Sequence, residues 1–140
     1  MTDRTNADYA AFALRVSTGV MFLAHGLTKL LVFTIPGTVA YFESLGLPGV
    51  LAYLTILAEV GGGAALILGV ATRAVSLAVL PVLLGAVWVH SGAGWSFSNA
   101  GGGWEFPLFW VVAQASVVLL GSGAFALRLP VVNNTLGRFA

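Results

Sequence analysis

Charged residues are scarce in this 140-residue chain: Lys, Arg, Asp and Glu together make up 8% of it, and hydrophobic residues make up 59%. A soluble domain is roughly half apolar and about a quarter charged. This composition, with a mean hydropathy of +0.97, therefore indicates an integral membrane protein. The net charge of +1 excludes a protein that binds nucleic acid electrostatically, and the sequence holds no basic cluster of the kind that recruits anionic lipid. The length leaves room for one domain, which we expect to span residues 1–140.

Cysteine is absent from the chain. Its absence excludes disulfide bonds, thiol relays, thiolate metal sites and iron–sulfur clusters held by this chain alone. Because no other electron carrier is evident in the sequence, electrons in any redox reaction would come from a partner protein or pass directly between bound substrates.

Four apolar segments have the length needed to cross a membrane, since about 20 helical residues cover roughly 30 Å of hydrocarbon. They run over residues 9–32, 49–70, 73–90 and 106–127. The connection at residues 69–73 is so short that the second and third segments must be antiparallel neighbours. The predicted fold is an all-α membrane protein, a bundle of four antiparallel transmembrane helices.

Basic residues are shared unevenly between the two ends of this predicted bundle. If both termini lie on one side, that side carries Arg4, Arg15, Arg73, Arg128 and Arg138, and the other side carries Lys29. Cytoplasmic segments hold the excess of Lys and Arg in membrane proteins. We therefore predict that both termini are cytoplasmic.

Two loops are expected on the outer side. The first contains a short amphipathic helix over residues 38–46, with Thr38 as its N-cap and Gly46 as a left-handed stop, lying flat at the headgroup level. The second, residues 91–104, is rich in glycine and carries Trp95, Phe97 and Trp104. It is either an aromatic belt with a flexible turn or a lid that folds over the mouth of the bundle.

Six ionisable residues lie within or at the edges of the apolar segments: Arg15, His25, Lys29, Glu59, His90 and Glu105. A charge at the centre of a transmembrane helix costs about 2.5–3.5 kcal/mol on insertion scales. Such side chains are therefore expected to face one another. His25 and Lys29 share one helix face because they are four residues apart, whereas Arg15 is expected to extend its side chain to the cytoplasmic surface.

Counting residues at 1.5 Å each gives these groups a depth. Glu59 falls near the midplane, His25 roughly 6 Å outward, and Lys29, His90 and Glu105 roughly 12 Å outward. We therefore predict a polar interior that opens outward and has Glu59 as its floor. A carboxylate there must pair, bind a ligand or carry a proton, because desolvation disfavours its charged form.

Structural roles remain open for the same residues. Lys29 can extend outward and fix the membrane topology, and Glu105 can cap the fourth helix. His90 can lie at the membrane interface without a functional role. His25 can make a structural bond to Glu59 or to a carbonyl.

Two further features concern helix packing. The spacings Ala58-x-x-x-Gly62 and Gly61-x-x-x-Ala65-x-x-x-Gly69 form ridges of small residues that allow helices to approach closely in lipid. Pro81 should kink the third segment or free a carbonyl there.

These residues together resemble the DoxX family over residues 10–122. The matching motifs are Arg15-x9-His25-Gly26-Leu27-x-Lys29, Ala58-Glu59-x-Gly61-Gly62, Leu68-Gly69-x-x-Thr72-Arg73, His90, and Asn99-x-Gly101-Gly102-Gly103-Trp104-Glu105-Phe106-Pro107. The last of these has one glycine more than the family pattern. The resemblance implies four transmembrane helices in a bacterial inner membrane. It also implies a link to quinol oxidase and thiosulfate:quinone oxidoreductase, and to quinone, catechol or oxidative stress.

The functional hypothesis that follows is a redox-linked subunit that binds a quinone or similar small aromatic between the helices. The resemblance places the family's polar set at His25, Lys29, Glu59, His90, Asn99, Trp104 and Glu105. Of these, we predict His25, Glu59 and His90 as catalytic groups and Lys29, Asn99, Trp104 and Glu105 as ligand-binding groups.

The sequence leaves open whether the chain is an enzyme. The alternative is a non-catalytic scaffold or interaction subunit, and a small-solute carrier is less favoured because four spans are few for a monomeric carrier. Expected partners are the lipid bilayer and a redox partner protein or further copies of this chain. No covalent cofactor is predicted, and no metal site, because no helix carries a metal-binding spacing of His and Glu.

Overall fold

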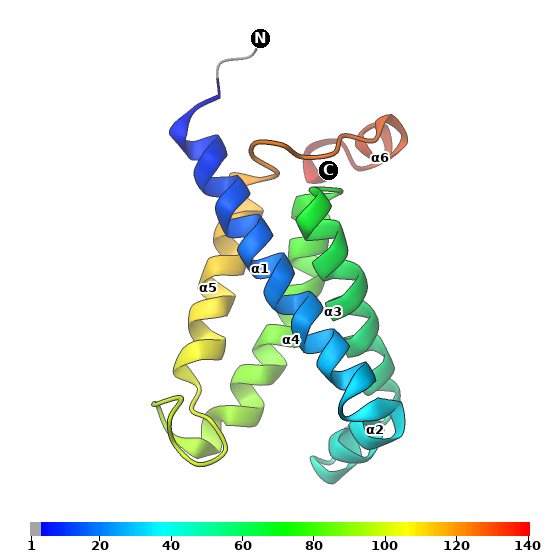
Figure 1. Cartoon of the computed structure of the whole chain (residues 1–140), viewed down its shortest axis with the longest axis vertical. Coiled ribbons are helices and arrows are strands. Elements are labelled where there is room, and N and C mark those ends of the chain that lie inside the picture. Colours follow the sequence, from blue (N-terminus) through cyan, green and yellow to red (C-terminus); the bar gives the residue numbers. More distant parts are fainter. Residues whose placement is uncertain (1–3) are drawn as a thin grey trace.

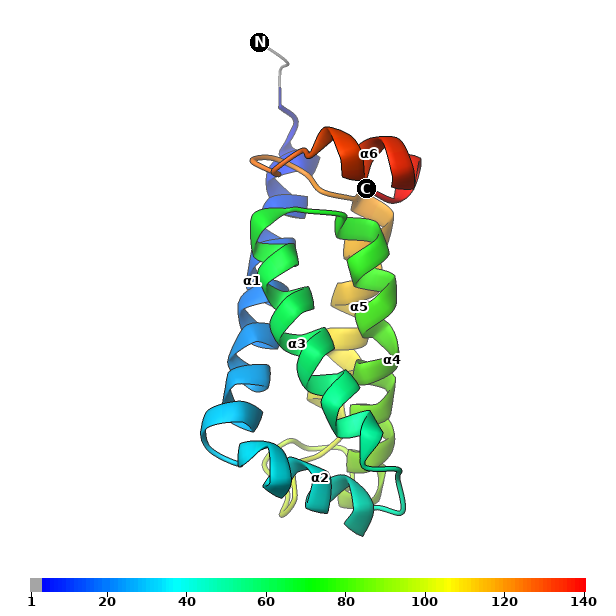
Figure 2. The ribbon, with the colours of Figure 1, turned by 90° about the vertical axis from the view of Figure 1, so that its right-hand side faces the viewer.

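The computed structural model describes residues 4–140 as an all-helical chain (Figures 1 and 2). Its helices are α1 (Asn6–Leu31), α2 (Thr34–Ser44), α3 (Val50–Leu68), α4 (Thr72–His90), η1 (Ser91–Ala93), α5 (Glu105–Leu120), α6 (Pro130–Leu136) and η2 (Gly137–Phe139). The long helices α1, α3, α4 and α5 run side by side. Helix α2 lies across one end of this bundle and α6 across the other (Figures 1 and 2).

Three helical segments are long and apolar enough to cross a membrane: Asn6–Leu31, Val50–Leu68 and Thr72–Ala93. Helix α5 is also apolar but has 16 residues. The predicted fourth segment is therefore too long at its C-terminal end: the helix stops at Leu120, because Gly121 adopts a φ of +83° that a helix cannot continue.

Both ends of the described chain lie at the same end of the bundle, beside the α3–α4 turn (Figure 1). We call this the arginine end, because all five arginines lie in the segments that meet there, and the opposite end, with α2 and residues 91–104, the loop end. Which side of a membrane each end faces stays a prediction.

The core lies where α1, α3, α4 and α5 meet. Phe22, Leu66, Val79, Leu83 and Trp110 form its buried hydrophobic cluster. The Phe22 and Trp110 rings pack with their centroids 4.6 Å apart.

Two of three consecutive glycines in α3 set how closely the helices approach. A Cβ on Gly63 of α3 would lie 2.6 Å from the Leu23 nitrogen of α1, so the two backbones touch there. A Cβ on Gly62 would lie 2.8 Å from the Val79 side chain of α4, whereas Gly61 faces open space. The predicted small-residue ridge through Gly62 is therefore used for packing within the chain, and Gly61 is not.

Arg15 holds the arginine end together, and its predicted extension to the surface is wrong. The side chain is fully buried and donates to carbonyl oxygens at the C-terminus of α3, those of Leu66 and Ile67, and in the segment after α5, those of Ser122 and Ala124. A helix C-terminus leaves carbonyls unsatisfied and carries partial negative charge. The guanidinium therefore caps α3 and ties the 121–129 segment to it.

Helix α2 differs from its prediction at the start and agrees at the end. It begins at Thr34, and Thr38 lies inside it, buried, with its hydroxyl donating to the Thr34 carbonyl at 2.9 Å. The helix ends as predicted, with Gly46 at a φ of +79° and the Leu47 N–H donating to the Phe42 carbonyl.

Candidate functional site

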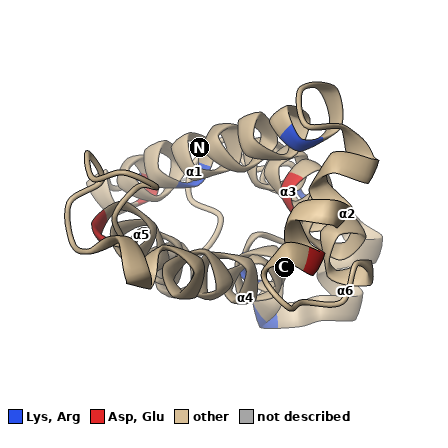
Figure 3. Ribbon diagram, turned by 90° about the horizontal axis from the view of Figure 1, so that it is seen from below, with Lys and Arg blue, Asp and Glu red and all other residues tan. Residues whose placement is uncertain are grey.

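A lysine and a glutamate from neighbouring helices form an ion pair inside the bundle. Lys29 Nζ of α1 lies 2.8 Å from Oε1 and 2.7 Å from Oε2 of Glu59 in α3. The Glu59 side chain is 7% exposed and that of Lys29 is 20% exposed. Among residues 4–140 this is the one salt bridge, and the view along the bundle shows acidic and basic positions as isolated patches on otherwise uncharged ribbons (Figure 3).

Gly26 makes this pair possible. A Cβ at Gly26 would lie 2.7 Å from the Val60 side chain and 3.0 Å from the Glu59 Cβ, so only glycine allows α1 to approach α3 this closely. Lys29 follows three residues later on the same side of the helix. Its Cα is therefore only about 4.5 Å beyond the level of Glu59, and its flexible stem reaches back to the carboxylate. The predicted depth difference of roughly 12 Å is corrected accordingly.

The ion pair faces a cavity of about 540 Å³ between α2, α3 and α4, which we call the α2–α4 cavity. Its volume lies within the range of small-molecule sites. Its walls are mainly apolar and aromatic, and its polar groups are few. Its lining includes Lys29, Tyr41, Thr55, Glu59, Trp88 and His90.

The cavity runs along the bundle rather than across it. On α4 its lining extends from Ala78 to His90, which is about 18 Å of helix. Helices α3 and α4 are antiparallel across the turn between Leu68 and Thr72. Glu59 is nine residues from this turn and His90 eighteen, so the two residues lie about 13 Å apart along the bundle.

His90 is held in place at the loop end. Its Nδ1 lies 2.7 Å from the Ala86 carbonyl oxygen, and because a carbonyl only accepts, Nδ1 carries the proton. Gly102, at a φ of +73°, lies over the ring: a Cβ there would be 3.3 Å from Cδ2 of His90. The glycine of the 91–104 loop thus lets the backbone cover the imidazole.

His25 is not brought to the ion pair. Its side chain is exposed, its Nδ1 bonds the Met21 carbonyl at 2.8 Å, and its ring centroid lies 5.1 Å from that of Trp110 in α5. It does not line the α2–α4 cavity. The expected contact between His25 and Glu59 is therefore replaced by the contact between Lys29 and Glu59.

The three remaining predicted residues organise the 91–104 loop. Glu105 Oε1 accepts the Phe97 N–H at 2.8 Å, and Asn99 Nδ2 donates to the Ala93 carbonyl at 2.9 Å. The Trp104 ring packs edge-on against Trp95, with centroids 4.7 Å apart. None of the three lines the α2–α4 cavity.

Sequence reasoning did not assign Tyr41, Thr55 and Trp88 to the site. Thr55 precedes Glu59 by four residues and so shares its helix face, which is a usable signal. Tyr41 had no comparable signal, because the position of α2 over the cavity depends on how the loop folds back. Among residues 4–140, no three His, Asp or Glu side chains are placed together to hold a metal ion.

Long apolar helices that pair their internal charges with one another define a multi-pass membrane protein. The profile of the DoxX family matches residues 10–92. The chain is 34% identical over 114 residues to a Bacillus subtilis (strain 168) protein named "Putative oxidoreductase CatD", with 81% of each chain covered. It is also 34% identical over 70 residues to "Inner membrane protein YqjF" of Escherichia coli (strain K12), covering 50% of this chain and 52% of that relative. No solved structure matches the chain.

The chain therefore belongs to the DoxX family. The predicted multi-pass location in an inner membrane is confirmed by the apolar helices together with the inner-membrane relative.

Proposed function

We propose that this protein is a redox-linked membrane subunit that binds a quinone, or a similar small aromatic molecule, in the α2–α4 cavity. The observation that carries the proposal is an ion pair and a histidine at two levels of one apolar cavity. The relative whose name describes an oxidoreductase supports a redox role.

The polar groups of the cavity suit a ring with oxygen atoms on opposite sides. Such a ring, with a hydrogen bond of about 2.8 Å at each oxygen, spans on the order of 10 Å. Side chains on a helix lean toward its N-terminus. Glu59 on α3 therefore leans toward the loop end and His90 on α4 toward the arginine end, so the two groups approach each other from their separation of about 13 Å.

Each polar group has a chemical role in this proposal. The Lys29 ammonium has a third donor beyond the two that face Glu59, and this donor binds one ligand oxygen. His90 donates its Nδ1 proton to a carbonyl, so its Nε2 is an acceptor and takes the hydroxyl of the other ligand oxygen when the ligand is in its reduced, quinol form. Glu59 holds or releases a proton beside the ligand. When bound, a quinone supplies the capacity to take up electrons and protons.

The test is binding of a menaquinone analogue to the full chain in detergent, followed by tryptophan fluorescence because Trp88 lines the cavity. We expect saturable quenching for the wild type. Glu59→Gln and His90→Ala should each weaken binding about tenfold, because the first takes from Lys29 the carboxylate that positions it and the second removes the imidazole that faces the other ligand oxygen.

His25→Ala is the matched control, since it removes the same side chain outside the cavity. It should bind like the wild type. Equal binding by all three variants and the wild type, or an equal loss in both histidine variants, would contradict the proposal. If the analogue binds neither the wild type nor any variant, and the substitutions only change the melting temperature, the result would favour the alternative of a non-catalytic interaction subunit.

A further inference from the structure

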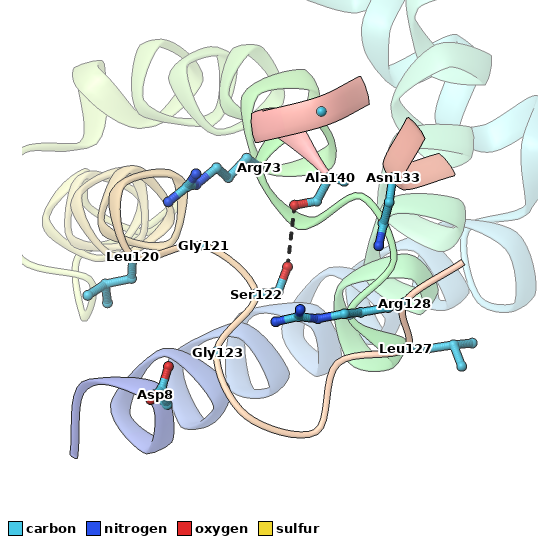
Figure 4. Close-up of a pocket in the computed structure, with 12 residues that line it drawn as sticks. Asp8, Arg73, Leu120, Gly121, Ser122, Gly123, Leu127, Arg128, Asn133 and Ala140 are labelled. Atoms are coloured by element: carbon cyan, nitrogen blue, oxygen red, sulfur yellow. Dashed lines mark hydrogen bonds between the residues drawn. The ribbon is translucent and has the colours of Figure 1, made fainter. Parts of the chain in front are cut away.

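A second cavity, of about 340 Å³, lies at the arginine end, and we call it the arginine-end cavity (Figure 4). Segments distant in the sequence build it: the first turn of α1, the α3–α4 turn, the 121–129 segment and the C-terminal helices. Its polar side chains are those of Asp8, Arg73, Ser122, Arg128 and Asn133. The α2–α4 cavity shares none of these residues, so this is a separate site.

Arg73 is fixed in the wall of this cavity. Its Nη1 donates to the Arg138 carbonyl at 2.9 Å and its Nη2 to the Leu119 carbonyl at 3.3 Å. The guanidinium lies against Gly121, where a Cβ would be 3.1 Å from Nε. Within residues 4–140, Nε is buried and has no hydrogen-bond partner. The guanidinium charge is thus held in the cavity wall by backbone carbonyls, and in the described chain no carboxylate is paired with it.

Arg128 is the second arginine that lines this cavity. Its side chain extends toward the turn at Ser122 and Gly123, with Asn133 beside it (Figure 4). In the part of the chain that the structure describes, no hydrogen bond or ion pair engages its guanidinium. Two guanidinium groups around one small polar cavity are the arrangement that binds phosphate oxygens in pairs.

The charge balance at this end also favours an anion. All five arginines lie here. In the described part of the chain two acidic groups face these five positive charges. The Asp8 carboxylate already accepts from the N–H and hydroxyl of Thr5, at 2.8 Å each, and the terminal Ala140 oxygen, which lines the same cavity, accepts from the Ser122 hydroxyl at 3.5 Å (Figure 4). Arg15 adds a buried positive charge whose partners are all backbone carbonyls.

The surroundings of the cavity resemble a membrane-interface segment. Phe125, Leu127, Leu129, Val131 and Phe139 are exposed around it, on the segment that lies across the end of the bundle (Figure 2). Exposed apolar side chains interleaved with arginines are typical of a segment that lies at the level of the lipid headgroups. The cavity is thus placed where a headgroup phosphate would reach it.

We propose that this cavity binds a phosphate group through Arg73 and Arg128, supplied by an anionic phospholipid headgroup or by free phosphate. The arginines are spread over the sequence from position 4 to position 138, so no basic cluster is visible there. The fold gathers them at one end.

The test uses the full chain in a nonionic detergent, with thermal unfolding and native mass spectrometry as readouts. Phosphatidylglycerol, phosphatidylcholine and inorganic phosphate are added separately. We expect phosphatidylglycerol to raise the melting temperature and to be retained, and phosphatidylcholine to do neither. A rise with inorganic phosphate alone would assign the site to free phosphate.

Arg128→Gln should weaken the retained anion about tenfold, because one pair of charged hydrogen bonds is lost. Arg128 makes no internal bond in the described chain, so this variant should fold normally. Arg138→Gln is the matched control: it removes the same charge at the same end from a side chain that packs on Phe139 and does not line the cavity. An equal loss in both variants, or no preference of the wild type for phosphatidylglycerol or phosphate over phosphatidylcholine, would overturn the proposal.

Discussion

At the scale of single residues, the position of one glycine decides whether the candidate site exists. Gly26 and Gly61 are both helical glycines, but a Cβ at Gly26 would lie 2.7 Å from the Val60 side chain and 3.0 Å from the Val60 nitrogen, whereas a Cβ at Gly61 would meet nothing within 4 Å. Gly26 sets the spacing over which Lys29 reaches Glu59.

Gly26→Ala should therefore lower the free energy of unfolding by about 1–3 kcal/mol, the usual cost of overpacking. Gly61→Ala should raise it by about 0.5–1 kcal/mol, because alanine is the better helix former. Thermal unfolding of the two glycine variants in detergent measures both changes. A similar shift in both would mean that α1 and α3 are not in contact at Gly26.

The residue scale also shows what sequence reasoning can and cannot supply. Buried charges must pair, and this rule correctly selected Lys29 and Glu59 as members of one interior. The rule did not give the partner. His25 and Lys29 share a helix face, yet His25 packs toward Trp110 of α5 while the Lys29 stem bends toward α3. A helical wheel predicts only roughly which way a side chain points from its helix. The packing of the neighbouring helices decides which partner the side chain meets.

At the scale of elements, the C-terminus of α3 depends on a side chain from α1. The Arg15 guanidinium satisfies the Leu66 and Ile67 carbonyls and bridges them to the segment after α5. Gly69 is needed beside it, since a Cβ there would be 2.8 Å from Arg15 Nη1. This contact orders the α3–α4 turn and with it the floor of the arginine-end cavity.

Arg15→Gln should lower the free energy of unfolding by about 3 kcal/mol or more, because several buried carbonyls lose their donor at about 1–3 kcal/mol each. Arg4→Gln, which removes an exposed arginine at the same end that lies over the Phe125 ring, should lower it by at most about 1 kcal/mol. The comparison is made by thermal unfolding. Near-equal melting of both variants would show that Arg15 is not a cap.

Element boundaries were predicted well where a turn has a local signal. The α3–α4 turn follows from Gly69 and its short length, and the stop of α2 follows from Gly46. The end of α5 was missed because residues 121–127 remain apolar after Gly121, and hydropathy does not distinguish a helix from an extended apolar segment. The start of α2 was missed because the chain turns into the helix at Thr34 with a φ of +63°, and no residue pattern in the sequence predicts this backbone conformation.

At the scale of the whole molecule, the bundle has a strong asymmetry: five arginines at one end, and Glu43, Glu105 and the 91–104 loop at the other. The rule that cytoplasmic segments carry the arginines predicts that the arginine end faces the cytoplasm. In the predicted orientation, a headgroup in the arginine-end cavity would come from the cytoplasmic leaflet.

The lack of cysteine makes the orientation directly measurable, since any introduced thiol is the sole label site. Ser98→Cys in the loop and Thr135→Cys in α6 are both exposed positions. A membrane-impermeant maleimide should label Ser98→Cys in intact cells and Thr135→Cys only after the membrane is opened. The reverse pattern would invert the predicted topology.

The shortness of α5 has a consequence for the surrounding lipid. Its 16 residues rise about 24 Å, against roughly 30 Å of hydrocarbon in a typical bilayer. A hydrophobic mismatch of about 6 Å thus falls on this one flank of the molecule. A span this short is met by local thinning of the bilayer, by flanking side chains that reach the interface or by association with another helix. The flank at α5 is therefore where we expect the lipid packing around the protein to differ most from that beside α1.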